Sequence, residues 1–129
     1  MLAVDTNVLV RLLARDNREQ AAAAAALFKR DSIWIAKTVL LETEWVLRNG
    51  YDFEDAAIAQ AFKSALSLEN VTAEGSHAVA NALALTSHGL DFADALHLSS
   101  RPAGATFVSF DRKLVRRAAS AGITGVVEP

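Results

Sequence analysis

The chain opens with Leu2-Ala3-Val4-Asp5-Thr6-Asn7-Val8-Leu9, a short apolar run that ends in an aspartate and continues with helical spacing. Such a run is typical of a buried strand that leads directly into a helix. Near the other end, Thr106-Phe107-Val108-Ser109-Phe110 leads in the same way into Asp111. Open α/β sheets place their ligands beyond the carboxyl ends of the strands. Both stretches therefore predict an α/β fold with an acidic edge.

Strand and helix patterns alternate between these two stretches. Strands are expected at 2–5, 32–36, 106–109 and 125–127, with a weaker one at 70–72. Helices are expected at 7–14, 18–30, 39–48, 53–68, 74–87, 92–100 and 112–121. Because strands separated by helices require crossover connections, the sequence predicts a central parallel sheet of four to five strands, covered by helices on both faces.

Length and composition predict one domain that spans residues 1–129. The hydrophobic fraction of 52% is high, so we expect some apolar surface to be covered by another chain. The absence of cysteine excludes disulfides, thiolate zinc sites and a cysteine nucleophile. No stretch approaches the roughly 18 apolar residues that a membrane span needs, and we expect no basic leader before the apolar N-terminal run. The expectation is a soluble protein without a membrane segment.

Four acidic residues lie where such a fold could bring them together: Asp5, Glu42, Asp94 and Asp111. The first and the last follow strands, whereas Glu42 and Asp94 lie in segments with helical spacing. The helical neighbours of Glu42 are largely apolar, which predicts that its carboxylate faces the packed side. A buried carboxylate without a partner costs several kcal/mol or takes up a proton, and a bound magnesium ion would resolve that conflict. Thr6, Asn7 and Ser109 are expected to support the site with hydrogen bonds.

The aspartates also have purely structural alternatives. Asp5 and Asp111 would serve as helix N-caps, a common use of aspartate worth about 1 kcal/mol. Asp91 is the better cap for the helix that carries Asp94, so capping does not explain Asp94. Asn7 is equally suited to capping the first helix.

Several other residues are expected outside the site. Glu44 lies four residues before Arg48, a spacing that favours a surface ion pair. His97 has no partner at ligand spacing, so a surface or core position is expected rather than a metal. Trp34 and Trp45 are predicted to pack in the core rather than to stack against bases.

The net charge is −2, from 13 basic and 15 acidic residues. If a metal neutralises the four candidate acids, 11 acidic residues face 13 basic ones and the balance becomes +2. Basic residues gather after Asp5 and around Asp111: Arg11, Arg15, Arg18, Arg101, Arg112, Lys113, Arg116 and Arg117. Such clusters suit a phosphate backbone, with Arg11, Arg112 and Arg116 as the predicted contacts. The alternative is that they are solvated helix faces.

Each candidate acid lies in a segment of distinctive pattern. In chain order, these segments are Leu2-Ala3-Val4-Asp5-Thr6-Asn7-Val8-Leu9, Val39-Leu40-Leu41-Glu42-Thr43-Glu44-Trp45-Val46-Leu47, Asp91-Phe92-Ala93-Asp94-Ala95-Leu96-His97-Leu98 and Phe107-Val108-Ser109-Phe110-Asp111-Arg112-Lys113-Leu114. Together they span residues 1 to about 117 and resemble the four motifs of the PIN-domain family. In particular, they are similar to those of the VapC-type toxin ribonucleases of bacterial toxin–antitoxin pairs.

The resemblance implies a metal-dependent endoribonuclease of three-layer α/β/α fold. By matching position, Asp5, Glu42, Asp94 and Asp111 would hold Mg²⁺ or Mn²⁺ and carry the catalysis. Phosphodiester cleavage needs a nucleophile made from water and stabilisation of charge on phosphorus and leaving oxygens, and metal ions supply all of these. The resemblance further implies an RNA substrate, a homodimer, a cognate antitoxin protein and a cytoplasmic location.

Two other functions remain open at this point. The chain could be a non-catalytic PIN-like binding or regulatory module that retains the fold and the acidic pocket. Less favoured is an aspartyl-phosphate phosphotransferase with Asp5 as nucleophile, because Asn7 stands where phosphatase-like folds carry a second aspartate. The RNA target and the number of metal ions do not follow from the sequence.

Overall fold

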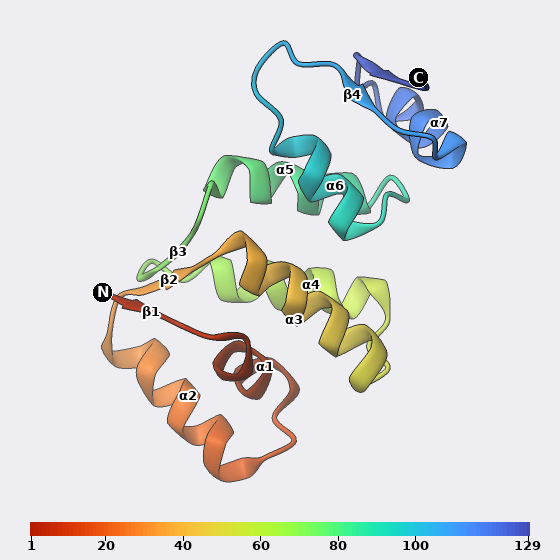
Figure 1. Ribbon diagram of the computed structural model, residues 1–129. Helices are drawn as coiled ribbons and strands as arrows, with labels where there is room; N and C mark the ends of the chain where they lie inside the picture. The colour runs from red at the N-terminus through yellow and green to blue at the C-terminus, as the bar shows by residue number, and fades with distance from the viewer. The chain divides into compact units, whose positions relative to one another are not determined.

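Strands and helices alternate along the chain as the sequence predicts (Figure 1). The computed structural model describes residues 1–129. It contains seven helices and five strands, and the strands form two parallel sheets. The chain divides into two compact units, Met1–Ser76 and His77–Pro129. That residues 1–129 form one domain stays a prediction.

The first unit contains a three-stranded parallel sheet in the order β1 (Leu2–Ala3), β2 (Ile33–Ile35), β3 (Val71–Ala73). Leu2 pairs with Ile33, and Ile33 pairs with Val71. In β2 both isoleucines are buried and Trp34 between them is partly exposed, which is the alternation of a strand with one packed face. The strand expected near residue 71 is confirmed, because β3 pairs with β2 along its whole length.

Four helices accompany this sheet: α1 (Thr6–Ala14), α2 (Arg18–Arg30), α3 (Lys37–Gly50) and α4 (Asp55–Leu66). Helix α1 packs against α2 and α3, and α3 packs against α4. Their buried side chains include Leu9, Phe28, Leu40, Leu47 and Phe62. The unit therefore has an apolar core of its own.

Capping residues set the starts of the first two helices. Asp5 is the N-cap of α1, so the alternative that Asn7 caps this helix is wrong. Asn17 caps α2 and accepts a hydrogen bond from the Gln20 backbone N–H at 3.0 Å. Arg15 ends α1 in a left-handed conformation with φ of 56°, which turns the chain toward α2.

Helix α3 corrects two predictions about burial. Its buried residues are Leu40, Thr43, Glu44 and Leu47, which lie on one face at helical spacing. Glu42 lies off this face and is exposed, so the prediction that it faces the packed side was wrong. Trp45 is 63% exposed, so the prediction that it packs in the core was also wrong.

Glu44 is the buried acid of α3, with only 5% of its surface exposed. Arg48 Nε donates to Glu44 Oε1 at 2.8 Å, and Arg48 also pairs with Asp55 at the start of α4. The predicted Glu44–Arg48 pair is confirmed, but it is buried on the Glu44 side rather than lying on the surface. Through Asp55, Arg48 also links α3 to α4.

Helix α5 (Ser76–Thr86) begins at the last residue of the first unit and continues in the second. The second unit also contains α6 (Phe92–Ser99) and α7 (Arg112–Ser120). Its sheet pairs β4 (Phe107–Val108) with β5 (Val126–Val127) in parallel, with Phe107 opposite Val126. Helix α7 forms the crossover between these strands. None of the seven helices has the length and apolar character needed to cross a bilayer.

Candidate metal centre

Asp5 stands at the junction between β1 and α1. Its Oδ1 accepts a hydrogen bond from the Thr6 backbone N–H at 2.8 Å, so the side chain caps the helix as the structural alternative predicts. The N-terminal end of a helix carries partial positive charge, which stabilises a carboxylate there. Asp5 is nevertheless exposed, which leaves its carboxylate accessible to a ligand.

Thr6 joins Asp5 to Glu42. The Thr6 hydroxyl donates a hydrogen bond to Glu42 Oε1, while its backbone N–H donates to Asp5. Thr6 itself is 6% exposed, so it is fixed in the core of the unit. Asp5 and Glu42 lie far apart in the sequence, but hydrogen bonds from Thr6 hold both carboxylates at the carboxyl end of β1.

The other two candidate acids lie in the second unit. Asp94 sits in the first turn of α6, which Asp91 caps by accepting from the Asp94 backbone N–H at 3.4 Å. Partial burial raises the pKa of Asp94, and the negative charges of Asp91 and Asp111 raise it further, whereas His97 opposes the shift. Asp94 therefore lies in a locally negative environment.

Asp111 begins α7 and is held from two sides. Its Oδ1 accepts from the Leu114 backbone N–H at 3.1 Å, and its own N–H donates to Ser109 Oγ at 3.0 Å. Asp111 is thus the N-cap of α7, as its structural alternative predicts. Like Asp5, Asp111 follows a strand at its carboxyl end and remains exposed.

Each unit contributes two of the four acids. Asp5 and Glu42 belong to Met1–Ser76, and Asp94 and Asp111 belong to His77–Pro129. Neither unit by itself holds a group of three or more histidine or acidic side chains arranged to bind a metal ion. That all four carboxylates converge on one metal centre stays a prediction.

A comparison with protein families matches residues 2–120 to the PIN domain. The chain belongs to the PIN domain family. The comparisons with curated proteins and with solved structures gave no match. Family membership agrees with the seven helices and the parallel strands, and it confirms the predicted three-layer α/β/α fold class. PIN domains are generally nucleases, act on nucleic acid and typically use divalent metal ions.

The donor groups of this PIN domain fit a hard divalent cation. All four candidate ligands are carboxylates, and Mg²⁺ and Mn²⁺ prefer oxygen ligands of this kind. Burial raises the pKa of Asp94, and the negative charges of Asp91 and Asp111 raise it further, so a positive ion beside this carboxylate would be favourable. A bound divalent cation would supply such a charge.

The three arginines predicted to contact phosphate differ in what they already bind. Arg11 Nη1 pairs with Asp16 at 2.9 Å and also contacts the Tyr51 hydroxyl. Arg112 Nε pairs with Glu128 at 3.0 Å. Arg116 is exposed on α7 and forms neither an ion pair nor a hydrogen bond. Of the three, Arg116 is the most available to a new anion.

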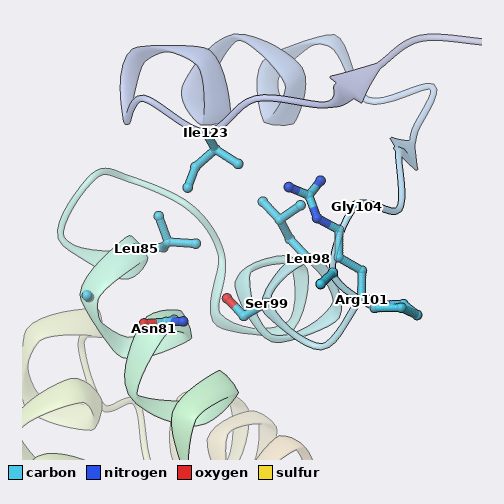
Figure 2. Close-up of a pocket in the computed structure, with 10 residues that line it drawn as sticks. Asn81, Leu85, Leu98, Ser99, Arg101, Gly104 and Ile123 are labelled. Carbon is cyan, nitrogen blue, oxygen red and sulfur yellow. The ribbon is translucent and has the colours of Figure 1, made fainter.

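Two cavities lie apart from the candidate acids. In the second unit, a cavity of about 470 Å³ lies between α5, α6, the loop at 101–104 and Ile123. Figure 2 shows Leu85, Leu98 and Ile123 around this space, with Arg101 at one side. In the first unit, a groove of about 270 Å³ runs between α1 and α2. None of the four acids lines either cavity, so neither is the candidate metal centre of this PIN domain.

Proposed function

We propose that this PIN domain is a metal-dependent endoribonuclease and the toxin of a toxin–antitoxin pair. Asp5, Glu42, Asp94 and Asp111 are proposed as the catalytic ligands of Mg²⁺ or Mn²⁺. The observation that carries the proposal is the pairing of Asp5 and Glu42 on Thr6, in a chain whose family consists generally of nucleases. Asp94 and Asp111 are proposed as the second pair, because the charge of Asp111 contributes to the raised pKa of Asp94.

The residues of the chain have distinct parts in this mechanism. Thr6 orients the carboxylates of Asp5 and Glu42 through its N–H and its hydroxyl. Ser109 accepts from the Asp111 N–H and fixes the start of α7, and Asn7, exposed on α1, would bond to groups around the site. When bound, the divalent ion would activate a water and stabilise charge on the scissile phosphate.

The substrate and partners are part of the same proposal. Arg11, Arg112 and Arg116 are proposed to hold the RNA backbone, because guanidinium groups match phosphate geometry. Arg116 is the most favoured, since it has no other partner. The protein would act in the cytoplasm, as a homodimer that a cognate antitoxin holds inactive. The high apolar fraction of 52% supports contacts with further chains.

Cleavage of labelled single-stranded and structured RNAs tests this function. Wild-type protein is expected to cut in the presence of Mg²⁺ or Mn²⁺ and to stop when EDTA is added. Asp5→Asn and Asp111→Asn should each lower the rate about 100-fold or more, since each removes a charged ligand. Glu69→Gln is the matched control, because Glu69 is exposed in the turn before β3, at the opposite end of the strands from Asp5.

The outcomes separate the proposed nuclease from its alternatives. Cleavage that survives EDTA or Asp5→Asn would point to a contaminating ribonuclease. RNA binding without cleavage under any metal would indicate a non-catalytic module. An acyl phosphate trapped on Asp5 would indicate phosphotransfer instead.

A further inference from the structure

Trp45 is an exposed indole in a polar stripe of α3. Each residue of an α-helix is rotated by about 100° about the helix axis from the one before. The stripe therefore spans a sector of roughly 60° and contains Thr38, Glu42, Trp45 and Asn49. All four are exposed, and Trp45 is 63% exposed. Trp45 is the one aromatic residue of the stripe. Its exposure contrasts with the buried apolar side chains of the same helix, Leu40 and Leu47.

Trp45 lies beside a proposed catalytic ligand. It is three residues after Glu42, which places the two side chains one above the other on the same helical face. Glu42 is held by the hydroxyl of buried Thr6. The indole therefore lies about one helical turn from a carboxylate that is held in place, on a helix that packs against α1 and α4.

The surroundings of Trp45 suit a nucleobase better than a protein surface. A docking surface for a protein is normally a contiguous apolar patch, whereas the stripe places a threonine, a glutamate and an asparagine in line with this indole. The Asn49 side chain donates to the Trp45 carbonyl oxygen at 3.0 Å, which leaves its own carbonyl oxygen free to accept from a base edge. A flat base with polar edges matches an indole with polar neighbours.

We propose that Trp45 is a stacking platform for one unpaired nucleobase of the RNA substrate. The base would stack on the indole, which would leave the adjacent phosphate near Glu42, where a bound divalent ion would offset the negative charge of both groups. Stacking on an aromatic side chain tolerates any base, because every base has a π face. The substrate at this position is therefore single-stranded. The inference rests on the proposed nuclease function and adds a residue that positions its substrate.

Fluorescence measures the contact without any cleavage. In a Trp34→Phe background, Trp45 is the sole tryptophan. Adding a short oligodeoxyadenylate in the presence of Mg²⁺ should quench its emission in a saturable way, with gel electrophoresis confirming that the oligonucleotide stays intact. A duplex of the same sequence should quench much less, because its bases are already stacked on each other. Equal quenching by both, or no quenching, would overturn the proposal.

Steady-state cleavage kinetics supply the second test. Trp45→Ala should raise KM for single-stranded RNA about tenfold or more, as expected for the loss of one stacked base, while kcat changes far less. Trp45→Phe should restore most of the affinity. Leu68→Ala is the matched control, because Leu68 is also an exposed apolar residue, at 43%, but precedes β3 at the opposite end of the strands.

The results distinguish this inference from the function on which it rests. If wild-type protein cleaves RNA with Mg²⁺ but Trp45→Ala leaves KM unchanged, the stacking role fails and the nuclease stands. If wild-type protein does not cleave, the nuclease fails and the quenching experiment alone decides on stacking. If Trp45→Ala converts a dimer to a monomer in sedimentation while KM stays constant, Trp45 is a subunit contact and the proposal is overturned.

Discussion

At the scale of single residues, the site depends on how carboxylates are held. Asp5 and Asp111 cap helices and are also exposed, so capping is compatible with the metal-binding role that we propose for them. The sequence predicted both roles because each aspartate follows a strand. It could not predict that Thr6 bridges Asp5 and Glu42, since that contact depends on the packing of α1 against α3. Nor could it predict the pKa of Asp94, which depends on burial and on nearby charges.

The raised pKa of Asp94 predicts a pH-dependent effect on stability. Its usual pKa is 3.8, and a higher value in the folded protein means that the folded state binds this proton more tightly. Stability from this group is therefore full below pH 3.8 and is lost as the pH rises through the folded pKa. At neutral pH without metal, Asp94→Asn should raise Tm, and this gain should vanish in acid.

Thermal unfolding with and without Mg²⁺ measures this prediction. Mg²⁺ should stabilise the wild-type protein and leave Asp94→Asn largely unaffected, whereas the Glu69→Gln control should respond like wild type. A lower Tm for Asp94→Asn in EDTA at neutral pH, or equal stabilisation of both proteins by Mg²⁺, would contradict the account.

At the scale of elements, helix α3 separates what the sequence determines from what it leaves open. The helix itself was predictable from its spacing, but the face it buries was not, because apolar residues occur all around it: Val39, Leu40, Leu41, Trp45, Val46 and Leu47. Packing against α1 and α4 selects the face that contains Leu40 and Leu47. Glu42 and Trp45 are left on the outside, which turns an expected buried ligand into an accessible one.

The ion pair of α3 gives a prediction about its docking to α4. Arg48→Met would leave Glu44 buried without its partner, which carries a large desolvation cost. We expect the free energy of unfolding to fall by about 2 to 3 kcal/mol, as measured by urea denaturation at neutral pH. The double change Glu44→Leu/Arg48→Met should recover much of this loss, because it removes the isolated charge. A single variant as stable as wild type would mean that Glu44 is solvated rather than buried.

At the scale of the whole molecule, the order of elements was predictable in nearly every case. Parallel strands separated by helices follow from short apolar runs and turn residues, and even the weak strand at Val71–Ala73 is present. The family match over residues 2–120 confirms the fold class. What local patterns cannot fix is which distant acids meet, because Asp5 and Glu42 lie in one unit and Asp94 and Asp111 in the other. The central claim is that all four bind one metal centre.

Calorimetric titration with Mn²⁺ tests this claim most directly. Wild-type protein and Glu69→Gln should bind the ion with the same affinity and heat. Asp5→Asn, in the first unit, and Asp111→Asn, in the second, should each weaken binding by about tenfold or more, because a shared site loses a ligand in either case. Wild-type affinity retained after the change in one of the two units would contradict a centre built from both.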